Sequence, residues 1–167
     1  MKVSGRNLGR RLLLLGDRIS RIKHRKGHGV HSPFVYSLVR KVFMNRKLAE
    51  GTGSVLYDLL RFEGVAERSA RQLHNLMFHL GAKSFSIDRV EGDLSILLSN
   101  YPTEALALAL EEAERDGLTL AVCHPYSSRE RQNAVAAMVA SHRSTTVDNR
   151  AYILFFNNHL PKQYYRL

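Results

Sequence analysis

The spacing of apolar residues changes near Gly81. Before this residue, apolar side chains recur every three or four positions, which is the period of one face of an α-helix. The first stripe of this kind is made by five residues, Leu8, Leu12, Leu15, Ile19 and Ile22. The pattern therefore predicts that helices occupy the N-terminal half of the chain, to about residue 80.

Capping signals divide this helical region. Ser32 followed by Pro33 is typical of a helix start, because the hydroxyl caps a free N–H group and proline lacks one. A helix is expected over about 33–48. The glycine-rich stretch 51–54 separates it from a further helical stretch that is interrupted near Gly64.

After Gly81 the pattern is that of strands alternating with helices. Strands are expected over 84–90, 94–99, 118–123, 145–148 and 151–156, and helices over 104–116 and about 128–142. Only Glu91, Gly92 and Asp93 separate the first two strands, which leaves no room for a crossover helix, so an antiparallel hairpin is expected there. The turn at 148–150 predicts a second hairpin.

This order of elements predicts an α/β protein with an N-terminal helical extension. Residues 1–80 are interpreted as a basic helical extension and residues 81–167 as an α/β core, and the two are expected to form one compact unit. A chain of 167 residues can bury about 70% of its unfolded surface without disulfide bonds.

The positive charge is concentrated in the N-terminal part of the chain. Residues 1–47 carry 13 lysines and arginines and a single acidic residue, Asp17, whereas residues 48–167 carry 12 basic and 14 acidic residues. A basic arm of this kind favours binding to nucleic acid, an anionic membrane surface or an acidic protein partner. A solvated face without a partner is the alternative.

Other features of the sequence restrict where the protein works. Cys123 is the only cysteine, which excludes an internal disulfide and a cysteine-based zinc cluster and is typical of a reducing compartment. No apolar run approaches the ~18 residues of a membrane span, and the run 12–15 is too short for a signal peptide. A cytoplasmic location is therefore expected.

Three stretches resemble a group of bacterial class I S-adenosylmethionine-dependent methyltransferases. They are the Lys-Gly-His-Gly-Val-His-Ser-Pro-Phe-Val-Tyr motif at 26–36, the Gly-Thr-Gly-Ser linker at 51–54 and the C-terminal segment 145–167. The resemblance implies the second half of a doubly wound, Rossmann-like sheet that ends in an antiparallel hairpin. It also implies S-adenosylmethionine as the cofactor.

The chain departs from this family at the positions that carry its chemistry. No Gly-x-Gly turn and helix follow the strand 84–90, so the family's cofactor loop and its next two strands are missing from the sequence. At two strand ends where the family has acidic residues, this chain has Leu98, Val122 and Cys123.

These departures predict a non-catalytic, methyltransferase-like protein that acts as a binding or scaffold module, with no cofactor and no catalytic residues. Two alternatives stay open. One is an active S-adenosylmethionine-dependent methyltransferase with an atypical cofactor site. The other is a module that binds nucleic acid or a membrane surface through the basic arm, residues 1–47.

A possible anion seat lies at the turn between the first two predicted helices. His28, His31 and Ser32 precede the second helix, where free N–H groups and basic neighbours suit a bound anion. No carboxylate lies nearby, so no metal site is expected, and a structural role for the histidines is the alternative. Cys123 and His124 adjoin in sequence, but neighbouring strand residues point to opposite faces, so no catalytic pair is expected.

The strand 84–90 is expected to form an open edge of the sheet, because the strands that cover it in the family are missing. Unpaired N–H and C=O groups at an edge promote pairing with another chain. A homodimer is therefore expected, through the 84–90 edge or through the apolar N-terminal helix. Coverage of this edge by a helix from residues 1–80 is the alternative.

Overall fold

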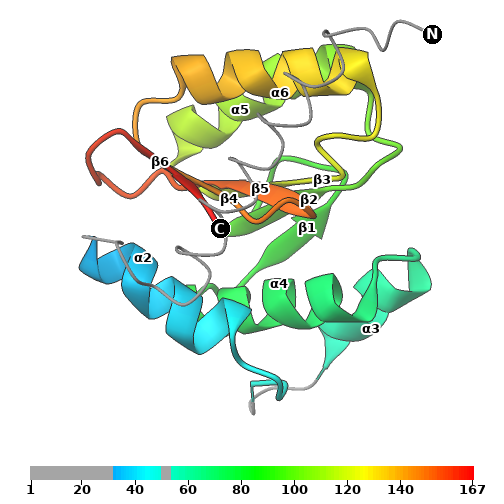
Figure 1. Ribbon diagram of the computed structural model, residues 1–167. Helices are drawn as coiled ribbons and strands as arrows, with labels where there is room; N and C mark the ends of the chain where they lie inside the picture. Colours follow the sequence, from blue (N-terminus) through cyan, green and yellow to red (C-terminus); the bar gives the residue numbers. More distant parts are fainter. Residues whose placement is uncertain (1–31, 50–53) are drawn as a thin grey trace, which may run out of the picture.

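The computed structural model describes residues 32–49 and 54–167, which form a six-stranded sheet with helices on both faces (Figure 1). The prediction of an α/β protein is confirmed. The apolar stripe from Leu8 to Ile22, the residues His28 and His31, and positions 50–53 lie outside the described residues.

Five of the six strands run in the same direction. The strands are β1 Phe85–Ile87, β2 Leu94–Leu97, β3 Thr119–Cys123, β4 Thr145–Asp148, β5 Tyr152–Phe155 and β6 Gln163–Arg166, in the spatial order β1-β2-β3-β5-β4-β6. β5 is antiparallel to both of its neighbours, and the other pairs are parallel. The ends of β1, β2, β3, β4 and β6 therefore meet along one side of the sheet, which we call the carboxyl edge.

The hairpin predicted at 148–150 is confirmed, since β4 and β5 pair with Val147 opposite Leu154. The edge strand β6 was not predicted. It lies parallel to β4, and most of its residues are exposed.

Two long helices cover one face of the sheet. α5 Leu106–Asp116, which follows a short 3-10 turn η2 Thr103–Ala105, connects β2 to β3, and α6 Arg129–Ser141 connects β3 to β4 (Figure 1). α5 ends at Gly117, whose φ of 70° suits glycine. Ser128 caps α6 by accepting a hydrogen bond from the N–H of Arg131. Both helices were predicted within two residues of these bounds.

The opposite face is covered by the N-terminal helices. α2 Pro33–Leu38 continues as a π-helix, η1 Val39–Phe43, and is followed by α3 Val55–Phe62 and α4 Glu67–Leu80 (Figure 1). The predicted start at Ser32 and Pro33 is confirmed, because the Ser32 hydroxyl accepts a hydrogen bond from the N–H of Val35 at 3.4 Å. The helix ends at Phe43, earlier than the predicted residue 48.

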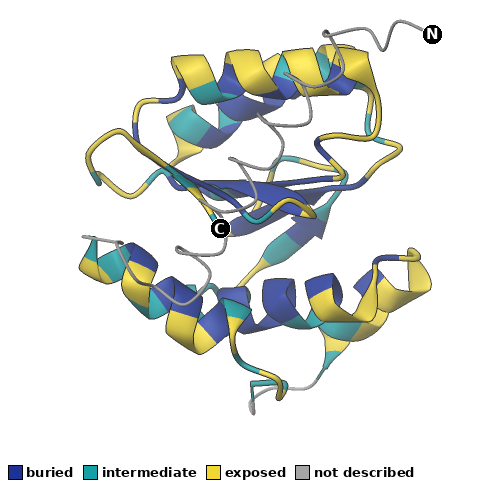
Figure 2. Cartoon of the chain, viewed as in Figure 1, coloured by how far each residue is buried: buried dark blue, intermediate teal, exposed yellow. Residues whose placement is uncertain are grey.

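The two helical layers enclose the sheet, and Figure 2 shows its central strands as buried, whereas the edge strand β1 is only partly buried and the edge strand β6 is mostly exposed. Leu38 and Leu73 from the N-terminal helices share one apolar cluster with Ile96 and Leu154 of the sheet. A second apolar cluster joins α5 and α6 to the other face. No helix among the described residues is long and apolar enough to cross a membrane.

The prediction of an antiparallel hairpin at 84–99 is wrong, because β1 and β2 are parallel, with Phe85 opposite Leu94 and Ile87 opposite Ile96. β1 has only 3 residues, so it spans about 10 Å, and residues 88–93 are long enough to return along it without a helix.

Two serines on neighbouring strands hold this return in place. The Ser86 hydroxyl lies 2.7 Å from the carbonyl oxygen of Arg89 and 2.9 Å from that of Glu91. The Ser95 hydroxyl accepts the N–H of Glu91 at 3.1 Å. The side chains of the strands therefore satisfy backbone groups that a regular crossover helix would bond internally.

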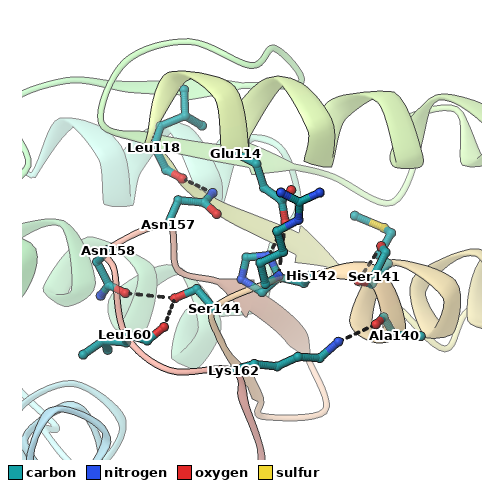
Figure 3. A network of polar contacts seen from close by, with 12 residues as sticks. Glu114, Leu118, Ala140, Ser141, His142, Ser144, Asn157, Asn158, Leu160 and Lys162 are labelled. Carbon is teal, nitrogen blue, oxygen red and sulfur yellow. Dashed lines mark hydrogen bonds and ion pairs between the residues drawn. The ribbon is translucent and has the colours of Figure 1, made fainter.

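The loop between β5 and β6 is anchored at the side of the sheet opposite the carboxyl edge (Figure 3). There the Ser144 hydroxyl donates to the carbonyl oxygen of Leu160 at 3.1 Å. Nearby, the buried ring of His142 forms a 2.8 Å contact between Nδ1 and the carboxylate of Glu114, which links α6 to α5. The Ser144 contact holds the loop that leads into β6, and the His142 contact holds the two helices together.

Candidate functional site

Open α/β sheets bind ligands beyond the carboxyl ends of their strands, so the carboxyl edge is the natural position for a site. The residues there are Asp88 after β1, Leu98 after β2, His124 after β3, Asp148 at the end of β4 and Arg166 at the end of β6. Asp88 and His124 have φ angles of 53° and 49°, which residues other than glycine seldom adopt. The chain thus turns sharply at the ends of β1 and β3.

The end of β1 is closed by a contact within the chain. The Asp88 carboxylate accepts a hydrogen bond from the backbone N–H of Leu98 at 2.7 Å. The N–H of Asp88 itself donates to the carbonyl oxygen of Ile96 at 2.9 Å. Asp88 therefore joins the ends of β1 and β2, and one of its carboxylate oxygens is used for this purpose.

The side chain of a buried arginine contacts the carboxyl ends of β2 and β3. Arg131 lies in the first turn of α6, and its guanidinium donates to the carbonyl oxygens of Tyr101 at 2.8 Å, Leu98 at 2.8 Å and Cys123 at 3.2 Å. Only 2% of the residue is exposed. Its Nε has no hydrogen-bond partner among the described residues.

The surroundings of Arg131 disfavour its charge, because burial removes water from the guanidinium and lowers its pKa. The three carbonyl dipoles that it contacts compensate part of this cost. The side chain thus acts as a buried clamp between two strand ends and the loop at Tyr101.

Cys123 and His124 are not arranged as a catalytic pair. Cys123 is buried and burial raises the pKa of its thiol to about 12, whereas His124 is exposed. A thiol with such a pKa is almost entirely protonated at neutral pH and is a poor nucleophile. His124 lies after β3 and not within it, and its φ is 49°, so the alternation of side chains along a strand does not apply to this pair.

Two tyrosines, one from the loop after β3 and one from β6, meet a buried carboxylate at the end of β4. The hydroxyl of Tyr126 donates to Oδ2 of Asp148 at 2.6 Å, and the hydroxyl of Tyr164 lies 3.1 Å from the same oxygen. Asp148 is fully buried, whereas the tyrosines are 39% and 41% exposed. The guanidinium of Arg166 lies 5.4 Å from the centre of the Tyr164 ring, a cation–π distance.

The chemistry of this cluster is that of hydrogen bonding. Burial, followed by the hydrogen bond to Asp148, raises the pKa of Tyr126, and burial together with the charge of Asp148 raises the pKa of Tyr164. Both hydroxyls therefore remain protonated at neutral pH and are held in fixed directions. Partly exposed rings with fixed hydroxyls suit stacking and polar recognition of a partner.

Sequence reasoning did not identify either the Arg131 clamp or the Tyr126–Asp148–Tyr164 cluster. Asp148 was interpreted only as part of the turn at 148–150. The available signal was topological and covered only part of the cluster: Tyr126 follows β3 and Asp148 ends β4, two strands that end on the same side of the sheet.

The predicted anion seat is described only in part. Ser32 is present, and its hydroxyl caps α2, while His28 and His31 lie outside the described residues. Among residues 32–49 and 54–167, no group of three or more histidine, cysteine, aspartate or glutamate side chains is placed to hold a metal ion.

Comparison with known proteins leaves the family of this chain open. No model of a known protein family matches it, and neither a curated protein nor a solved structure matches it.

Proposed function

We propose that this protein is a non-catalytic, methyltransferase-like binding or scaffold module. The observation that carries the proposal is the position of Arg131, whose guanidinium binds the carbonyl oxygens of Leu98 and Cys123. By the sequence resemblance, Leu98, Val122 and Cys123 occupy positions where the family has acidic residues. All three side chains are buried. Because the Arg131 side chain holds these strand ends together, the carboxyl edge is consistent with a role in stabilising the fold.

The connection from β1 to β2 supports the same proposal. In dinucleotide- and nucleotide-binding sheets, a glycine-rich turn and the N-terminus of a helix follow the first strand and receive the ligand. Here residues 88–93 return directly to β2, and the hydroxyls of Ser86 and Ser95 contact their backbone groups. The antiparallel hairpin of β4 and β5 is the part of the fold that agrees with the resemblance.

Titration with S-adenosylmethionine and S-adenosylhomocysteine tests the proposal. A ligand at about 100 times its dissociation constant stabilises the native state that binds it by about 2.7 kcal/mol. We expect no saturable change in the thermal midpoint with either compound, while a methyltransferase of known cofactor affinity responds under the same conditions. Saturable stabilisation would favour the alternative of an active enzyme with an atypical cofactor site.

A second candidate function is binding of nucleic acid by the basic arm. Arg40, Lys41, Arg46 and Lys47 are all exposed, and no acidic residue occurs between positions 32 and 49. Tyr36, which is 48% exposed, lies on the same stretch. Cations beside an exposed aromatic ring are the combination with which proteins bind phosphate backbones and stack on bases.

Fluorescence anisotropy with a random single-stranded oligonucleotide tests this second function. Binding that weakens steeply with salt, and that weakens further when the four cations are replaced by glutamine, would support it. The matched control replaces four exposed arginines elsewhere, Arg89, Arg115, Arg129 and Arg143, by glutamine. Equal losses in the two variants would contradict a site at residues 40–47.

A further inference from the structure

The exposed side of α2 and η1 carries a row of three side chains with different chemistry. Tyr36 is 48% exposed, Met44 is 41% exposed, and Arg40 lies between them and is also exposed. A spacing of four residues makes Tyr36 and Arg40 neighbours on the helix surface. In the π-helix η1 the N–H of Met44 donates to the carbonyl oxygen of Val39, five residues earlier, and this wider turn brings Met44 into the same row.

The opposite side of these helices is used by the core. Val35, Leu38 and Val42 are fully buried in the apolar cluster that the N-terminal helices share with the sheet. A helix that binds a membrane surface inserts a whole apolar face, and here that face is already covered. The exposed row therefore suits a ligand that combines negative charge with an aromatic part.

The chain after η1 extends this row with further cations. Arg46 and Lys47 are exposed in the segment 44–49, which has no regular secondary structure and which we call the strap. Three residues of chain span at most about 11 Å, so the backbone of Lys47 lies within that distance of Met44. The cations of the strap are thus close to the end of the row.

Two buried amide side chains of α4 fix the path of the strap. Nε2 of Gln72 donates to the carbonyl oxygen of Phe43 at 3.0 Å. Asn75 donates through Nδ2 to the carbonyl oxygen of Lys47 at 2.9 Å, and its Oδ1 accepts the N–H of Ala49 at 2.8 Å. The cations of the strap therefore project from a backbone whose position is set before a partner arrives, which reduces the entropy lost on binding.

We propose that this surface binds single-stranded nucleic acid, whose phosphates contact Arg40, Arg46 and Lys47 while a base stacks on the ring of Tyr36. The inference rests on the second candidate function, nucleic-acid binding, and adds the class of nucleic acid. Cations attract the phosphates of single strands and duplexes alike. The faces of the bases are covered within a duplex, whereas those of a single strand are open to stacking on an aromatic side chain.

Fluorescence anisotropy of the full chain with three probes of equal length tests the inference. The probes are a single-stranded DNA, a strand of the same length without bases, and the corresponding duplex. Tyr36→Ala is expected to raise the dissociation constant of the single strand about fivefold or more and to leave the other two unchanged, because only the single strand offers a base to the ring.

Two further variants serve as controls. Tyr36→Phe keeps the ring and is expected to bind all three probes as the wild type does. Leu108→Ala truncates a residue that is 58% exposed on the opposite helical layer, and it is expected to change no dissociation constant. Circular dichroism confirms that each variant is folded.

The salt dependence of binding separates stacking from charge. Tyr36→Ala removes no cation, so the slope of log K against log salt is expected to stay that of the wild type, whereas Arg40→Gln reduces it by about 0.7 on the single strand. Equal losses of Tyr36→Ala on all three probes, or no loss on any, would overturn the inference and leave nucleic-acid binding standing. If none of the probes binds, the nucleic-acid function fails and the inference fails with it.

Discussion

The guanidinium of Arg131 donates to the carbonyl oxygen of Leu98 over 2.8 Å, across 33 positions of sequence. This contact joins the first turn of α6 to the end of β2, and a second contact of the same group reaches the end of β3. A buried cation is therefore the feature that holds the crossover helix, two strands and the loop at Tyr101 together.

Arg131→Met is expected to destabilise the protein by about 2–4 kcal/mol, because methionine fills similar space but leaves buried carbonyl oxygens without donors. Urea denaturation measures this change as a lower midpoint at an unchanged slope. The control Arg129→Met, at an exposed position two residues earlier, is expected to change the free energy of unfolding by less than about 0.5 kcal/mol. Equal effects of the two substitutions would contradict the clamp.

Tyr126→Phe is expected to reduce the free energy of unfolding by about 1–3 kcal/mol at neutral pH, because it removes a donor to the buried carboxylate of Asp148. The raised pKa of Tyr126 stabilises the fold fully below about pH 10, and this contribution is lost as the pH rises above it. Wild type should thus lose more stability than Tyr126→Phe in alkali. Tyr36→Phe, at an exposed position, is the control for both measurements.

Cys123 provides a chemical probe of the carboxyl edge, since it is the only cysteine and is buried. We expect no reaction with a disulfide reagent in the native protein and full reaction after denaturation. Its pKa is raised to about 12 from 9.0, so its contribution to stability is complete below about pH 9 and declines as the pH rises towards 12.

The alkaline effect is separable from that of the tyrosines with Cys123→Ala. Between about pH 8 and about pH 10.5, wild type is expected to lose about 2 kcal/mol more stability than this variant. The reason is that the thiol of the wild type can ionise once the chain unfolds, whereas the variant has no thiol. Parallel pH dependences would mean that the thiol is accessible to water in the native state.

Local signals explain which parts of the fold were predictable. The ends of α4 and α5 follow from Gly81 and Gly117, and the start of α2 follows from Ser32, because a cap acts through residues within one turn. The hairpin of β4 and β5 likewise depends on a short turn. The predicted lengths of β1 and β2 were too long, since the chain turns at Asp88 and leaves only 3 and 4 residues in strands.

The missed features depend on contacts between distant residues. Arg131 lies between exposed neighbours at the start of a helix, and nothing in its local sequence distinguishes it from a solvated arginine. Its role follows only from the arrival of two strand ends at the same place. The parallel pairing of β1 and β2 was missed because the length rule for crossovers assumes a helix, whereas here serine hydroxyls bond the returning backbone.

Asp93 is the last residue of the segment 88–93, which connects β1 to the parallel strand β2. Replacing Asp93 tests whether side chains hold this short connection in place. Its carboxylate accepts the N–H groups of Lys83 at 2.7 Å and Ser84 at 3.0 Å. These backbone hydrogen bonds, that to Lys83 first, lower the pKa of Asp93. A lowered pKa means that the stabilisation is complete above about pH 4 and is lost as the pH falls below that value.

Asp93→Ala is therefore expected to lower the free energy of unfolding at neutral pH by about 1 kcal/mol and to make stability less sensitive to acid below about pH 4. Hydrogen exchange should also accelerate at the amides of Lys83 and Ser84, which lose their acceptor. The control Glu111→Ala removes an exposed carboxylate from α5 and is expected to change neither property. If exchange at these two amides were unchanged in Asp93→Ala, the backbone itself would hold β1 beside β2, and the serine and aspartate contacts would be a consequence of the parallel pairing.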